Sequence, residues 1–258
     1  MKKITVLLLA FLLVFTNANA QARSVKNFTA EILNPCTVYL SWVGISDKAD
    51  SFVVAYENER SPYFNWHEIK GTSFTLDWLI PGGKYRFWVG DMDENPEDTM
   101  YSDISRYIRL TMPKPERYTT GGFTLNSVEL YRHQDDANWL KSKDRRIATK
   151  EDSLFDVIDG KAYYSLVLNY NLPNPDKNEH INKIIWVLTT PEGSEYSGDA
   201  EAPNGIFKTT AENNSLSFLF NAEILEMIQY SEQKIKNGTY TFSVYFDGKL
   251  AAEKKVEW

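Results

Sequence analysis

The chain has 258 residues, of which 43% are hydrophobic, and its formal net charge is −7 at neutral pH. A chain of this length and composition is long enough to bury two cores of ordinary domain size. The acidic balance excludes nucleic acid and anionic lipid as favoured partners, because both require a basic surface.

The first 22 residues have the pattern of a secretory signal peptide. Two lysines precede an apolar run over residues 4–15, which is shorter than the ~20 residues of a spanning helix. Small residues before the cut predict cleavage after Ala20 or Ala22. The mature chain is therefore predicted to be exported, to the periplasm or the cell exterior, with no membrane span. The Met-Lys-Lys start is typical of a bacterial leader.

Cys36 is the single cysteine, so no intramolecular disulfide can form, although export permits one. We expect a free, partly buried thiol; pairing with another chain is the alternative. Stability must then come from apolar cores.

Residues 23–112 have the pattern of seven short strands. Apolar residues recur at every second position, on one face of a strand, along four stretches, and the last strand is expected over residues 104–110. The alternating apolar residues are Val38, Leu40 and Trp42; Phe52, Val54 and Tyr56; Phe74 and Leu76; and Tyr85, Phe87 and Val89.

A tyrosine corner joins two of these strands. In the run Leu79-Ile80-Pro81-Gly82-Gly83-Lys84-Tyr85, the tyrosine stands where its hydroxyl reaches back to the turn backbone. Together with Trp42 and the strand over residues 52–56, the pattern Leu79-x-Pro81-Gly82-x-x-Tyr85-x-x-x-Val89 resembles a fibronectin type III domain. Trp78 departs from the family, which usually carries a small residue there.

Residues 113–118 contain alternate prolines, which favour an extended chain, so we predict a short semi-rigid linker. Residues 119–258 are again rich in strand patterns. The predicted strands cover 123–131 (bent near 126–127), 161–170, 184–188, 206–210, 216–220, 240–246 and 250–258.

Three further features complete the second domain. The continuous apolar run 184–188 predicts a strand covered on both faces, and Asp247-Gly248 predicts a hairpin turn. Helical spacing within 221–237 predicts a short helix between strands, whereas 133–153 is expected to be a loop. With Trp186 as a buried central tryptophan and Tyr240 as a corner tyrosine, this half weakly resembles an immunoglobulin-like sandwich. The fold class is all-β, two tandem immunoglobulin-like β-sandwiches.

No catalytic arrangement is recognisable. His67-Glu68 lacks the second histidine of a zinc protease motif, and His133 and His180 stand in unrelated polar stretches, so all three are expected at the surface. Gly82-Gly83-Lys84 opens a strand and not the helix of a phosphate-binding loop. We therefore predict no enzyme, no cofactor and no metal. A pair of carboxylates that meets only in the folded chain keeps a secreted hydrolase as an alternative.

Strand alternation predicts an outward apolar patch. If the alternating residues point inward, Arg86, Trp88, Val53 and Ala55 point outward, and neighbouring strands bring Trp88 close to the other two apolar residues. Such patches mark interfaces. Packing against the second domain, or cover by the stem of Arg86, are the alternatives. Trp66 is either an exposed aromatic of the kind that stacks on a sugar or a plug at the sandwich end.

An acidic stretch from Asp91 to Asp103 joins the last two strands of the first domain. Pro96 and Ser102 break the pattern of an EF-hand, which leaves a looser calcium site or a solvated connector as alternatives. The resemblance to fibronectin type III domains implies a contact surface here. The acidic residues proposed for it are Asp91, Asp93, Glu94, Glu97 and Asp98.

These features predict an exported, non-catalytic binding or adhesion module that recognises a protein or glycan partner. A secreted hydrolase and a structural spacer in an envelope assembly are the alternatives.

Overall fold

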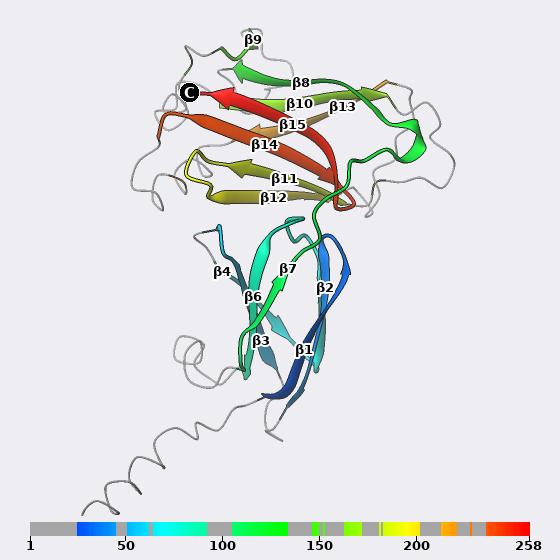
Figure 1. Ribbon diagram of the computed structural model, residues 1–258, viewed down its shortest axis with the longest axis vertical. Coiled ribbons are helices and arrows are strands. Elements are labelled where there is room, and N and C mark those ends of the chain that lie inside the picture. Colours follow the sequence, from blue (N-terminus) through cyan, green and yellow to red (C-terminus); the bar gives the residue numbers. More distant parts are fainter. Residues whose placement is uncertain are drawn as a thin grey trace, which may run out of the picture.

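The computed structural model of the protein describes residues 25–44, 51–61, 64–91, 105–133, 146–149, 152, 163–171, 181, 183–201, 213–220, 228 and 236–258. The leader predicted over 1–22 and the strand predicted over 206–210 lie outside these residues. The described strands stack in two blocks, one above the other along the long axis (Figure 1).

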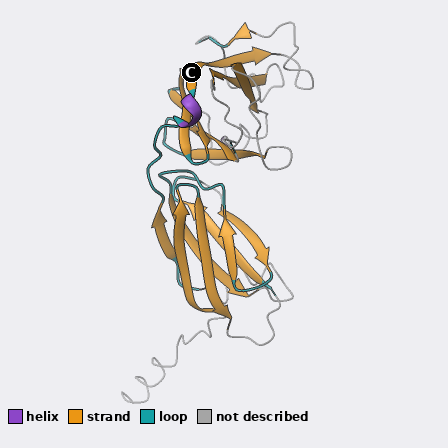
Figure 2. Cartoon of the chain, turned by 90° about the vertical axis from the view of Figure 1, so that its right-hand side faces the viewer, coloured by secondary structure: helices purple, strands orange, loops and turns teal. Residues whose placement is uncertain are grey.

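The first block is a sandwich of two antiparallel sheets with the strand orders β1-β2-β5 and β4-β3-β6-β7. Figure 2 shows the two layers face to face. This order confirms the predicted seven-strand sandwich resembling a fibronectin type III domain. The strands are β1 (Val25–Asn34), β2 (Thr37–Gly44), β3 (Phe52–Asn58), β4 (Phe64–Ile69), β5 (Ser73–Leu76), β6 (Lys84–Asp91) and β7 (Ile108–Thr111).

The predicted alternation places the core of this sandwich between its sheets. The inward residues of β2, β3 and β6 are buried, with Val38, Leu40, Val54, Phe87 and Val89 all at 0% exposure. The last strand is shorter than predicted. Ser105 is buried, and its N–H donates to the Val89 carbonyl at 2.7 Å while its hydroxyl accepts the Val89 N–H at 2.9 Å, so a side chain replaces one of the two backbone bonds of a regular pair.

The tyrosine corner forms as predicted. The Tyr85 hydroxyl accepts the Ile80 N–H at 2.7 Å, and burial raises the pKa of this phenol. Gly82 has a φ of 77°, and a Cβ on Gly83 would lie 2.7 Å from the Tyr85 ring. Both glycines are therefore needed to bring the tyrosine back over its own turn.

The second block contains a short 3-10 helix, η1 (Thr120–Gly122), and two four-stranded antiparallel sheets with the orders β13-β10-β8-β9 and β12-β11-β14-β15. Their facing sides share one core, which confirms the all-β architecture. The strands are β8 (Thr124–His133), β9 (Arg146–Ile147), β10 (Tyr163–Asn171), β11 (Lys183–Thr189), β12 (Glu195–Glu201), β13 (Asn213–Phe220), β14 (Thr239–Phe246) and β15 (Lys249–Glu257).

Several local predictions hold in this domain. The pairing of β8 with β10 skips Asn126, at the predicted bend. Asp247 and Gly248 both have positive φ, of 48° and 80°, as a two-residue hairpin turn requires. The Tyr240 hydroxyl donates to the Lys236 carbonyl at 2.8 Å, in the manner of a corner tyrosine. Trp186, in contrast, was predicted to be a buried central tryptophan but is only half-buried at the edge of the core; it lies so close to Gly198 that a Cβ on Gly198 would meet its ring at 2.4 Å.

Two predictions for this domain are wrong, and a third falls mostly outside the described residues. The segment expected to be a loop contains β9, which pairs with β8 and is held by the Arg146–Asp152 ion pair. His133 is buried rather than solvated, although it ends β8 on the face opposite to that of the core residue Leu130; its ring lies 6.1 Å from that of Tyr163, its pair on β10. Of the segment 221–237, only Ile228 and the last two residues are described, so the helix stays a prediction.

Replacing Tyr85 with phenylalanine would leave the buried Ile80 N–H without its acceptor. We expect the free energy of unfolding to fall by about 1–3 kcal/mol, measured by urea denaturation. Tyr39→Phe is the matched control, because Tyr39 is 37% exposed on β2. Equal stabilities of the two variants would contradict a stabilising role for the corner.

Candidate functional site

The outward face of the sheet β4-β3-β6-β7 carries a row of side chains that we call the aromatic row: Trp66, Ala55, Trp88 and Tyr107. Ala55 pairs with Trp66 on β4 and with Trp88 on β6, so these three lie side by side across the strands. Tyr107 stands just before β7, and its ring lies 5.5 Å from that of Trp88. The predicted approach of Trp88 to Ala55 is therefore present, and Val53 lies next along β3, opposite Gly90.

Exposure separates the members of the aromatic row. Trp66 is 51% exposed and Tyr107 is 50% exposed. Ala55, which lies between Trp66 and Trp88, is only 1% exposed. Trp88 and Val53 are half-buried. The sequence prediction did not include Tyr107. Continuing the β6–β7 register would have found it, since Arg86 pairs with Arg109 and the next outward residues are Trp88 and Tyr107.

Neither Arg86 nor the second domain covers Trp66 on this face. Arg86 forms an ion pair with Glu57 and holds its guanidinium 5.9 Å from the centre of the Tyr107 ring. It thus borders the aromatic row at one end and leaves Trp66 half exposed. The second domain makes its apolar contact elsewhere, at the end of the sandwich around Ile80 and Trp78.

The acidic stretch contributes little to the described site. Asp91 ends β6, where its backbone pairs with Phe52. The other predicted residues, Asp93, Glu94, Glu97 and Asp98, lie outside the described residues. In the described part of the chain there is no group of three or more side chains able to hold a metal ion. Within the same ranges, no helix is long and apolar enough to cross a membrane.

A second candidate site lies at the junction of the two domains, which begins with an apolar contact. Cys36 and Ile80 of the first domain are buried together with Ile185, Val187 and Tyr245 of the second. Ile185 and Val187 point out of the second core, whereas their neighbours Ile184 and Leu188 point into it. Strand β11 is therefore covered on both faces, as its continuous apolar run predicts.

Polar contacts hold the junction on both sides of this apolar contact. Glu195 at the start of β12 accepts hydrogen bonds from Arg60 at 2.9 Å and from the Asn58 amide at 3.0 Å. On the other side, Lys183 forms an ion pair with Asp77 and lies 5.6 Å from the centre of the Trp78 ring. The departure at Trp78 thus has a physical reason, because this side chain belongs to the contact between domains. Its φ of 72° turns the backbone in a way that L-residues rarely adopt.

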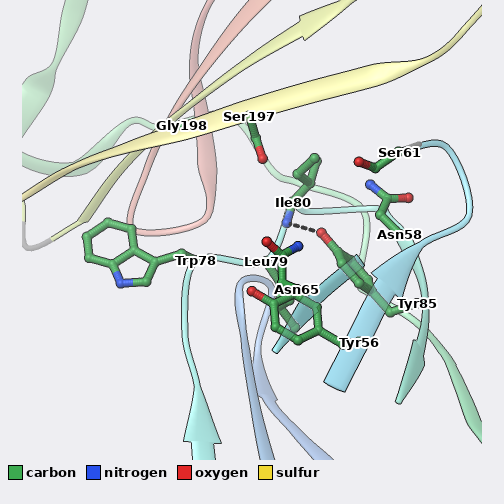
Figure 3. A pocket seen from close by; sticks show the side chains of 10 residues that line it. All are labelled: Tyr56, Asn58, Ser61, Asn65, Trp78, Leu79, Ile80, Tyr85, Ser197 and Gly198. Atoms are coloured by element: carbon green, nitrogen blue, oxygen red, sulfur yellow. Dashed lines mark hydrogen bonds between the residues drawn. The ribbon is translucent and has the colours of Figure 1, made fainter. Parts of the chain in front are cut away.

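A cleft of about 210 Å³ lies beside this junction. Figure 3 shows Tyr56 and Tyr85 rising toward it from the first domain, while the ribbon that carries Ser197 and Gly198 passes above them. Asn65 and Trp78 contribute further wall. The described lining combines aromatic rings, amides and hydroxyls from both domains.

Solved structures similar to this chain are mostly fibronectin type III domains. The domain from human contactin 1 has a TM-score of 0.32 and 16% identity, covering 38% of this chain and 83% of that chain. The two-domain segment of chicken tenascin has a TM-score of 0.29 and 10% identity, covering 91% of this chain and 98% of that chain. The FN5 domain of Drosophila Lar has a TM-score of 0.31, 16% identity and coverages of 35% and 96%. No protein-family model and no curated protein matches the sequence.

The rate at which a reagent labels the Cys36 thiol reports how often the contact between the two domains opens. Its thiol is 2% exposed, and burial raises its pKa, so both accessibility and thiolate content are low. We expect labelling by a disulfide reagent at pH 8 to be at least about a hundredfold slower in the folded protein than in urea.

Lys183→Ala removes the ion pair with Asp77 and should accelerate labelling of Cys36. Lys70→Ala is the control, because Lys70 is exposed just after β4, at the end of the sandwich where Ile69 pairs with Phe52 and away from the junction. Equal rates in the two variants would show that the Lys183 contacts do not hold the domains together.

Proposed function

We propose that this protein is an exported, non-catalytic binding module, and that the aromatic row binds a protein partner. The observation that carries this proposal is the alignment of two tryptophans and a tyrosine across one sheet face, with Trp66 and Tyr107 each half exposed. Exposure of large aromatic side chains to water is unfavourable in free energy, and a partner that covers them removes this cost.

The composition of this face favours a protein partner. Tryptophan, tyrosine and arginine are the residues that most often carry binding energy at protein–protein interfaces. Here Arg86 adjoins Tyr107, and its charge is already balanced by Glu57. A partner that covers this face would therefore not bury an unpaired charge.

Ring orientation argues against a polysaccharide on the aromatic row. The planes of Trp88 and Tyr107 stand 74° apart, in an edge-to-face arrangement. A chain of sugar rings lying along the sheet would require aromatic faces that share one plane. Because these two rings are not coplanar, the surface of the aromatic row is uneven, and side chains of a protein partner can pack between the rings.

Alanine at both Trp66 and Trp88 should weaken partner binding at least about thirtyfold, the effect of losing one interface hot spot. The test uses the mature protein as bait against the envelope and culture fractions of its source. The captured protein is then purified, and its Kd is measured for both forms. Tyr39→Ala is the control, since Tyr39 is a 37% exposed aromatic on the opposite sheet. Unchanged Kd in the double variant would refute the role of the aromatic row.

Export is part of this proposal and rests on the pattern of residues 1–22. Expression of the full chain in a bacterium should release a mature form that begins at Gln21 or Arg23. Intact mass and N-terminal sequencing of the periplasmic and culture fractions check this. A full-length product confined to the cytoplasm would show that the leader does not function.

A further inference from the structure

We propose that the cleft between the two domains binds a single ring of a neutral saccharide. This inference is independent of the aromatic row, because the cleft lies at the end of the first sandwich rather than on its outer sheet face. It rests on the charge, the hydrogen-bonding groups and the size of the cleft.

None of the described residues that line the cleft carries a charged side chain. Tyr56, Asn65 and Tyr85 form the side of the first domain, and Ser197 with the Gly198 backbone forms the side of the second. The ionised groups nearest the junction already have partners, Glu195 with Arg60 and Asp77 with Lys183. An ionic ligand would therefore enter without a counter-charge, which is costly. The lining selects a neutral polar ligand.

The Tyr85 hydroxyl is a buried polar group beside the cleft. Tyr85 is 4% exposed, and its oxygen accepts the Ile80 N–H at 2.7 Å. The side chain of Asn58, which also lines the cleft, is a second hydrogen-bonding partner of this phenol. Phenol and amide groups each donate and accept hydrogen bonds, so together they can pair with a hydroxyl of a bound ligand.

The remaining groups match the two kinds of surface on a sugar ring. A hexose has C–H patches that pack on aromatic rings, which Tyr56 and Trp78 supply, and hydroxyls that both donate and accept. Asn65 and Ser197 can do both as well, and both residues are exposed, which gives a ligand a way in from solvent. A volume of about 210 Å³ is below the roughly 300–1,000 Å³ of sites for drug-sized ligands, so it suits one ring.

The test is a titration of the mature two-domain protein with the methyl glycosides of glucose, galactose, mannose, N-acetylglucosamine and fucose. Binding is followed by saturation-transfer NMR and calorimetry. We expect at least one glycoside to bind with a Kd near 1 mM, as is usual for a ligand of this size. An oligosaccharide that ends in the same sugar should bind as well or better if the natural ligand is a glycan terminus, and worse if it is the free sugar.

Variants locate the binding. Ser197→Trp introduces a large side chain from the edge strand β12 and should weaken glycoside binding at least about tenfold. Ser73→Trp, at an exposed serine on β5, is the matched control and should leave it unchanged. Asn65→Ala should also weaken binding without filling the cleft, and Trp66→Ala should not, because Trp66 belongs to the aromatic row.

Two results would overturn the proposal. One is the absence of binding by every glycoside at 50 times the expected Kd, about 50 mM. The other is glycoside binding that Ser197→Trp and Asn65→Ala both leave unchanged while circular dichroism shows a native fold. Either result would leave the proposed role of the aromatic row unaffected, because that role is measured with a protein partner.

Discussion

The hydrogen bond between the Tyr85 hydroxyl and the Ile80 N–H is the interaction on which most of this structure depends. It fixes the turn so that Leu79 enters the first core while Ile80 points to the second domain. Trp78, one residue earlier, reaches Lys183. Leu79 thus enters the first core while its two neighbours, Trp78 and Ile80, belong to the contact between domains, and a local bond within one turn determines how the two domains meet.

The junction combines burial with charge pairing in a way that resists sliding. The apolar contact around Ile80 and Ile185 stabilises close approach but has no direction, since hydrophobic burial is proportional to area. The bonds from Arg60 and Asn58 to Glu195, and the pair of Lys183 with Asp77, lie on either side of it. Two directed contacts at separate points define an orientation. The cleft beside them therefore keeps its shape, and a ligand would find its walls already in place.

Sequence reasoning succeeded where a pattern is local and periodic. The period of two placed Val38, Leu40 and Phe87 inward and Trp88 outward, and Asp247-Gly248 marked its hairpin. It failed where the outcome depends on residues distant in the chain. The hydrogen bond from Arg60 to Glu195 joins residues that are 135 positions apart, and no local sequence pattern predicts it. Tyr107 lies within the strand predicted over residues 104–110, but it was missed because the sequence does not give the register of that strand against β6, which places Tyr107 beside Trp88.

The hairpin of β3 and β4 shows how one short element serves two surfaces. Successive residues of a strand point to opposite faces, so Ala55 and Trp66 belong to the aromatic row, whereas Tyr56 and Asn65, the next pair in register, line the cleft. A one-residue shift of this pairing would exchange the two sets and destroy both surfaces together. The Tyr56 ring packs 6.2 Å from Phe87 and 6.3 Å from Tyr85, which ties the register to the core and to the corner. The corner tyrosine thus helps to hold both surfaces in place.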